Sequence, residues 1–143
     1  MLGESLGPEE YTNRLADEIH QVDHADLGNW SDLVFDAWEQ QASVFIIGNG
    51  GSAATATHMS QDFAKSLHPE EQLEEPATKR LRVQSLTDNV GWLTAVANDL
   101  GYEHVFTQQL RNLANPGDLL IAISGSGKSE NILHAVACAN DAG

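Results

Sequence analysis

Two short apolar runs, each followed by a loop of small residues, most constrain how this chain can fold. Val44–Ile47 stops at the glycine-rich loop 48–51, and Leu119–Ile123 stops at the serine- and glycine-rich loop 124–129. An unbroken apolar run bounded by glycine is typical of a strand buried on both faces. Leu81–Leu86 is a further candidate strand. Because helical patterns separate the three runs, the sequence predicts an α/β fold with βαβ crossovers and a parallel sheet.

Helical periodicity occupies most of the remaining chain. Apolar residues recur at three- and four-residue steps before the first strand, with a break expected at residues 26–29, and Pro69 and Pro76 mark residues 68–79 as a surface loop. We expect residues 1–42 to be a helical segment for oligomerisation and residues 43–143 to be the ligand-binding domain. The expected helices cover residues 9–41, 52–67, a stretch after Asp88, 103–113 and 130–142.

The two loops are candidate phosphate sites. Both lead from a strand into a helix, and ligands of parallel sheets bind at the carboxyl ends of the strands. Glycine at 48, 50 and 51 permits close backbone approach, and the free amides at a helix start attract anions. The loops also offer hydroxyl groups for a phosphate: Ser52, Ser124, Ser126 and Ser129. The alternative interpretation is that both loops are only tight turns and helix caps.

Two nucleotide-binding patterns nearly fit these loops. Gly48, Gly50 and Ala53 match the loose dinucleotide-binding pattern, but Asp88 lies too far downstream for the usual ribose contact. Gly127-Lys128-Ser129 resembles the end of a P-loop, but Ala122 stands where that motif requires glycine. A nucleotide kinase or dehydrogenase is therefore disfavoured.

Acidic and imidazole side chains after the first loop and the second strand are the candidate catalytic, metal-binding or ligand-binding residues. His58 and Asp62 are spaced i, i+4, so they share one helix face, with Lys65 near it. Such a pair can bind a divalent metal, act as a base with an orienting partner, or form a surface ion pair. Asp88 follows the second strand and could either cap the next helix or contact a ligand.

Charge and composition exclude several classes of partner. The formal net charge is −14, and the basic stripe of a duplex nucleic-acid binder is missing. An anionic membrane surface would repel the chain, and no apolar stretch reaches bilayer length. Cys138 is the single cysteine, so neither an internal disulfide nor a cysteine zinc site can form. No signal peptide is apparent, and we expect a cytoplasmic protein.

Several separated motifs resemble the SIS (sugar isomerase) family, in its phosphoheptose isomerase branch. They occur in the family's order and cover nearly the whole chain. The motifs are residues 44–54, His58-Met59-Ser60-Gln61-Asp62, Ser85-Leu86-Thr87-Asp88, residues 97–102 and residues 116–127. The resemblance implies a three-layer αβα parallel sheet of the flavodoxin-like, doubly wound type, preceded by N-terminal helices.

The resemblance also implies an activity. It suggests a homotetrameric isomerase that converts sedoheptulose 7-phosphate into a heptose 7-phosphate aldose through an enediol. Asp62 would stand in the place of the catalytic glutamate, and His58 and Asp62 would be a metal pair, often for zinc. The implied substrate contacts are Asn49, Gly50, Gly51, Ser52, Asp88, Ser124, Gly125, Ser126 and Ser129.

The chain departs from the family pattern at three places. Asp62 is one methylene shorter than glutamate, and Gly125 stands where a hydroxyl residue is common. The family continues past residue 143 with a helix that carries a glutamine and a histidine of the metal site, so we expect a C-terminally truncated chain, a fragment, or a protein that relies on partner subunits. These departures leave open an alternative, a non-catalytic SIS module that binds sugar phosphates or a protein partner, such as the replication-initiator-associating type.

Overall fold

The computed structural model describes residues 6–143, which divide between Leu33 and Val34 into two compact units. The first unit holds α1 (Pro8–His20) and the beginning of α2 (His24–Gln40). Pro8 occupies the first turn of α1, and the Glu10 carboxylate accepts the Gly7 amide at 2.9 Å. The expected break at residues 26–29 is wrong. The chain breaks before His24 because the Asp23 carboxylate accepts the Ala25 amide at 2.8 Å and so starts the helix earlier.

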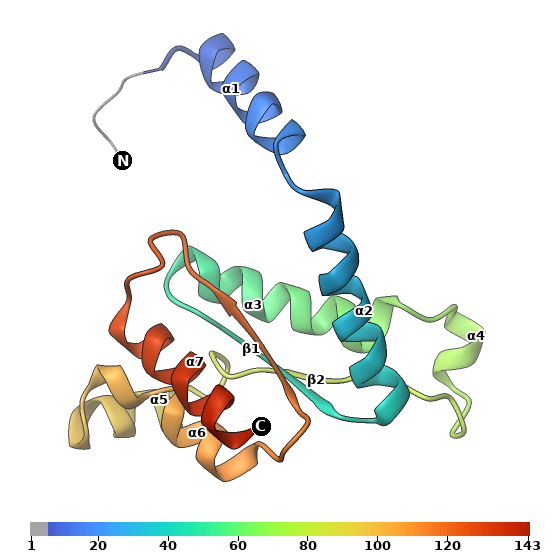
Figure 1. Ribbon diagram of the computed structural model, residues 1–143. Helices are drawn as coiled ribbons and strands as arrows, with labels where there is room; N and C mark the ends of the chain where they lie inside the picture. The colour runs from blue at the N-terminus through green and yellow to red at the C-terminus, as the bar shows by residue number, and fades with distance from the viewer. Residues whose placement is uncertain (1–5) are drawn as a thin grey trace. The chain divides into compact units, whose positions relative to one another are not determined.

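A parallel three-stranded sheet forms the centre of the second unit (Figure 1). Its strands are β1 (Ser43–Gly48), β2 (Arg82–Ser85) and β3 (Leu119–Ile123), in the order β2-β1-β3. Phe45 of the central strand is in register with Gln84 on one side and Leu120 on the other. The three predicted strands and the predicted parallel sheet are therefore confirmed.

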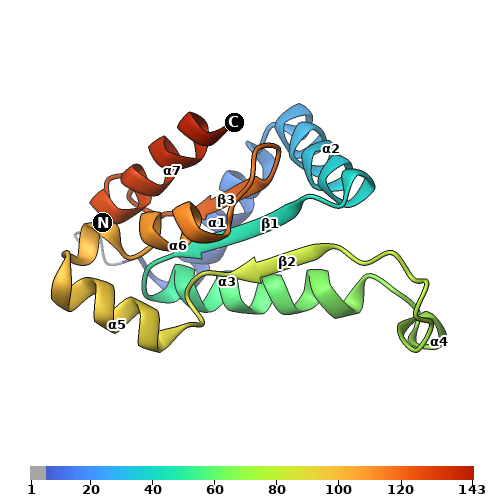
Figure 2. The same cartoon turned by 90° about the horizontal axis from the view of Figure 1, so that it is seen from below.

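Helices cover both faces of this sheet (Figures 1 and 2). On one face, Phe45 and Ile47 of β1 belong to an apolar core with α5 (Val90–Asp99), α6 (Thr107–Leu113) and α7 (Glu130–Ala142). On the other face, the alternate β1 residues Val44 and Ile46 pack in a second core that includes α3 (Gly51–Gln61) and the end of α2. Strand β1 is buried on both sides because it is apolar at every position from 44 to 47. The predicted three-layer αβα class is thus confirmed.

The helices around the sheet differ from expectation in three places. The predicted loop 68–79 contains a short helix, α4 (Glu70–Leu73), and the helix expected from residue 103 begins at Thr107 after a 3-10 turn, Tyr102–His104. Helix α3 (Gly51–Gln61) does not run evenly to residue 67 but passes at Asp62 into a π-helical turn, Asp62–Ser66. Within residues 6–143, every helix is too short or too polar to span a bilayer.

Candidate functional site

The two predicted phosphate loops lie side by side. Gly48, the last residue of β1, is in register with Ile123, the last residue of β3, and the strands run parallel. The loops that begin at Asn49 and Ser124 therefore leave the sheet at the same carboxyl edge. This is where ligands of open α/β sheets bind, between the starts of the two following helices, α3 and α7.

The first loop is a tight strand-to-helix turn in which glycine is required at two positions. A Cβ atom on Gly48 would lie 2.6 Å from the backbone carbon and oxygen of Ser52, so α3 can approach β1 only because residue 48 has no side chain. Gly50 adopts φ +54°, a left-handed conformation that also favours glycine. The Ser52 amide donates to the Asn49 carbonyl at 3.0 Å, while its hydroxyl has no hydrogen-bond partner among residues 6–143. A ligand at this turn would meet the Ser52 hydroxyl and the amides of Gly50 and Gly51.

In the second loop, two serine hydroxyls accept backbone amides. Ser124 Oγ accepts the Gly127 amide at 3.1 Å, and Ser126 Oγ accepts the Lys128 amide at 3.2 Å. Each hydroxyl still has its proton, which it can donate to a phosphate oxygen. Ser129 is the N-cap residue of α7 without a side-chain cap bond, so its hydroxyl is available in the same way. Gly125 lies exposed in the loop, and an added Cβ would meet no heavy atom within 4 Å.

A network of side chains that the sequence did not reveal joins the loops. Asn49 and Asn131 form a reciprocal amide pair, in which each Nδ2 donates to the other's Oδ1 at 2.9 Å. The Tyr102 hydroxyl donates to the same Asn49 Oδ1 at 3.0 Å. Asn131 lies in the first turn of α7, directly after the second loop. The predicted substrate contact Asn49 is thus held by residues from two other segments.

Asp88 lies at the same edge of the sheet, but it does not cap α5. The N-cap residue is Asn89, whose Oδ1 accepts the Trp92 amide at 3.0 Å, so the capping role suggested for Asp88 is wrong. Asp88 Oδ1 instead accepts the Thr57 hydroxyl of α3 at 2.6 Å. This bond ties the end of the second strand to the helix that carries His58. The Oδ2 atom of Asp88 has no protein partner within residues 6–143 and can accept a ligand hydroxyl.

His58 and Asp62 lie close together on α3, as their spacing predicts. His58 Nε2 is 3.3 Å from Asp62 Oδ2, and the side chains are 75% and 50% exposed. Asp62 begins the π-helical turn, and such turns occur frequently at functional sites. His58 follows Gly51 by two helical turns, about 10 Å along the axis. The pair therefore lies beyond the phosphate loops along the same helix.

The His58–Asp62 geometry fits part of a zinc site. Two ligands of a tetrahedral zinc ion, with bonds of about 2.0–2.2 Å, are about 3.4 Å apart. The observed separation of 3.3 Å meets this requirement, and it also suits a plain ion pair. Within residues 6–143, no group of three or more histidine, cysteine or acidic side chains is placed to hold a metal ion. The pair can supply two ligands, and the others would come from water, substrate or residues outside this range.

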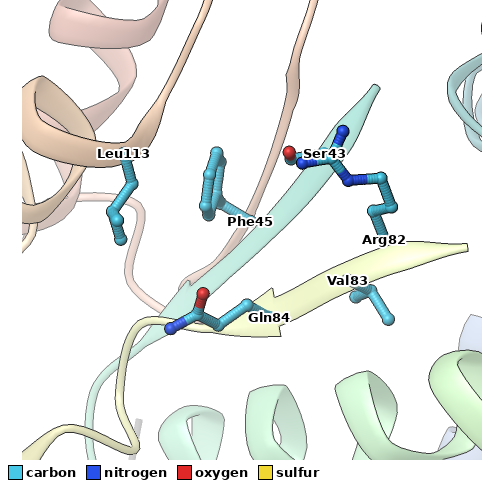
Figure 3. Close-up of a pocket in the computed structure, with 6 residues that line it drawn as sticks. All are labelled: Ser43, Phe45, Arg82, Val83, Gln84 and Leu113. Carbon is cyan, nitrogen blue, oxygen red and sulfur yellow. The ribbon is translucent and has the colours of Figure 1, made fainter. Parts of the chain in front are cut away.

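A hollow of about 280 Å³ lies at the opposite end of the sheet (Figure 3). Ser43 and Arg82, which begin β1 and β2, line it together with Phe45, Gln84 and Leu113. Since ligands of parallel sheets bind at the carboxyl ends of the strands, this hollow is not part of the candidate site.

Comparison with known proteins agrees with this arrangement. Residues 9–143 match the SIS domain family model. The chain is 41% identical over 112 residues to a phosphoheptose isomerase of Synechocystis sp., covering 78% of this chain and 54% of that protein. It is 44% identical over 111 residues to a phosphoheptose isomerase of Helicobacter pylori, with the same 78% and 54% coverage. The chain thus spans about half the length of the curated relatives it matches.

Solved structures show the same similarity. The phosphoheptose isomerase from Neisseria gonorrhoeae superposes with a TM-score of 0.79 at 30% identity, covering 92% of this chain and 65% of that one. The Francisella tularensis phosphoheptose isomerase gives a TM-score of 0.82 at 29% identity, with 93% and 66% coverage. The chain belongs to the SIS domain family, and the relatives and solved structures that it resembles here are phosphoheptose isomerases.

Proposed function

We propose that this protein is a phosphosugar isomerase that interconverts sedoheptulose 7-phosphate and the corresponding heptose 7-phosphate aldose. The observation that carries the proposal is the placement of a glycine-rich and a serine-rich loop at one sheet edge, beside the helix that presents His58 and Asp62. The named activity of the relatives supports the same reaction.

The loops would bind the phosphate group. A phosphate between the starts of α3 and α7 meets the free amides and the partial positive charge of two helix N-termini. The hydroxyls of Ser52, Ser124, Ser126 and Ser129 can each donate to its oxygens. These local donors can hold an anion even though the formal net charge of the chain is −14.

Asp62 would carry the chemistry as a general base. Its carboxylate removes the proton from C1 of the ketose, the C–H electrons form the C1=C2 bond of an enediol, and the C2 carbonyl oxygen gains a proton. Returning a proton to C2 and removing one from the C1 hydroxyl gives the aldose, with no net change in protons or electrons. In this proposal the phosphate binds at the two loops and C1 of the sugar lies at the Asp62 carboxylate.

A divalent metal, zinc in our proposal, would bind at His58 and Asp62. When bound, such an ion would polarise the carbonyl oxygen of the substrate. His58 would contribute a nitrogen ligand and fix the orientation of the Asp62 carboxylate through the i, i+4 spacing.

We further propose that the protein is a homotetramer in the cytoplasm, where sugar phosphates are metabolised. The apolar residues of its first unit support assembly. Tyr11, Leu15, Ile19, Val22 and Leu27 are all exposed. An exposed apolar stripe of this kind is typical of a surface that packs against another subunit.

Calorimetric titration with sedoheptulose 7-phosphate, with and without zinc, tests the proposal. We expect binding that zinc strengthens, and Asp62→Asn should abolish turnover, whereas Asp36→Asn, at an exposed carboxylate on α2, should leave it unchanged. Binding without zinc dependence or turnover would instead favour a non-catalytic sugar-phosphate module. No sugar-phosphate binding, or binding only of ATP with magnesium, would contradict both.

A further inference from the structure

The hydrogen bonds of Asn49 leave this side chain with one free group. A carbonyl oxygen has two lone pairs, and those of Asn49 Oδ1 accept from Asn131 Nδ2 at 2.9 Å and from the Tyr102 hydroxyl at 3.0 Å. One Nδ2 hydrogen donates to Asn131 Oδ1 at 2.9 Å. The second Nδ2 hydrogen has no partner within residues 6–143. Asn49 can therefore offer a ligand one N–H donor and no acceptor.

Asn131 is a rigid support for this arrangement. It is 2% exposed, and it lies in the first turn of α7 beside Ile132, which is 4% exposed and belongs to the core against the sheet. The amide of Asn131 therefore cannot move far without moving α7. Its pairing with Asn49 also fixes how far the first loop lies from the start of the helix that follows the second loop.

Tyr102 supports Asn49 from another side and can be altered without harm to the core. Its side chain is 58% exposed, and it comes from the 3-10 turn between α5 and α6. Its hydroxyl occupies the second lone pair of Asn49 Oδ1 and so favours one orientation of the amide. Turning the amide over would set Asn49 Nδ2 against Asn131 Nδ2, two donors with no acceptor between them.

We propose that Asn131 and Tyr102 are positioning residues, which hold Asn49 so that its remaining N–H donates to an oxygen of the bound sugar phosphate. The proposal rests on the proposed function, since it assumes a sugar phosphate at this edge of the sheet. Neither residue needs to touch the ligand; both act through Asn49. Their loss therefore matters only while Asn49 is present.

A double-mutant cycle on the full chain tests this inference, with sedoheptulose 7-phosphate as the probe and NMR titration as the measure of affinity. Tyr102→Phe removes one hydrogen bond to Asn49, and we expect affinity to fall about three- to tenfold. Asn131→Ala should weaken binding at least as much. In an Asn49→Ala background, both changes should leave affinity unaltered, because their effect passes through Asn49.

Tyr11→Phe is the matched control, because Tyr11 is the other of the two tyrosines in the chain and lies on α1. It should change neither affinity nor the side-chain amide signals of Asn49, which Tyr102→Phe should shift. If the losses from Tyr102→Phe and Asn49→Ala simply add, or if the Asn49 signals do not move, the positioning role is overturned while the proposed function stands. If the unaltered chain does not bind the sugar phosphate, the proposed function and the inference that rests on it both fail.

Discussion

Replacing Gly48 with alanine tests how strongly the first loop depends on the close approach of α3 to β1. The new Cβ would lie 2.6 Å from the backbone carbon and oxygen of Ser52 and 2.9 Å from its Cβ. Backbone atoms in the first turn of a helix cannot swing aside as the end of a side chain can, so helix and strand must separate. Overpacking of this kind costs about 1–3 kcal/mol. We expect the free energy of unfolding of Gly48→Ala to fall by this amount.

Gly51→Ala provides the matched control at the first residue of α3. A Cβ there meets no heavy atom within 4 Å, so the unfolding free energy should stay the same or rise by up to about 1 kcal/mol. Urea denaturation followed by circular dichroism measures all three proteins. A Gly48→Ala chain within about 0.5 kcal/mol of the unaltered chain, a difference typical of unconstrained surface sites, would refute the reasoning.

Three further predictions concern other residues. Asn89→Ala should lower the unfolding free energy by about 1 kcal/mol because α5 loses its cap, whereas Asp88→Ala should mainly weaken sugar-phosphate binding. Denaturation measures the stability of each variant and titration measures its affinity. Equal stability losses in the two variants would contradict the assignment of the cap to Asn89. Gln109 is 1% exposed and donates to two backbone carbonyls at 2.9 and 3.0 Å. Gln109→Met should therefore cost about 1–3 kcal/mol in thermal denaturation. His58→Ala should remove the effect of zinc on calorimetric sugar-phosphate affinity without changing stability, and a retained zinc effect would count against the metal pair.

The sheet could be predicted from the sequence because its signals are local. The unbroken apolar run Val44–Ile47 is buried on both faces, and it is followed by the small residues that a strand-to-helix turn requires. Parallel strands bring the two loops to one edge by topology alone, so the sequence predicts that Ser52 and Ser124 lie at the same edge of the sheet. The i, i+4 spacing likewise placed His58 beside Asp62.

Features that depend on tertiary contacts could not be predicted in this way. Asp88 and Asn89 are neighbours with equal capping propensity, and the choice between them is decided by Thr57 of α3, whose hydroxyl bonds to Asp88. The positions of Asn131 and Tyr102 around Asn49 join segments 53 and 82 residues apart in the sequence. An asparagine in the first turn after a serine-rich loop was the available signal, but it does not reveal its partner.

Incubating the chain with sedoheptulose 7-phosphate and zinc in D2O, and following the sugar by NMR, tests the isomerase assignment most directly. We expect a heptose 7-phosphate aldose to appear with deuterium at C2, because the proton that Asp62 removes exchanges with solvent before one is returned. Asp62→Asn should give neither aldose nor deuterium. An unaltered chain that binds the sugar phosphate but leaves the ketose unlabelled and unconverted would contradict the assignment.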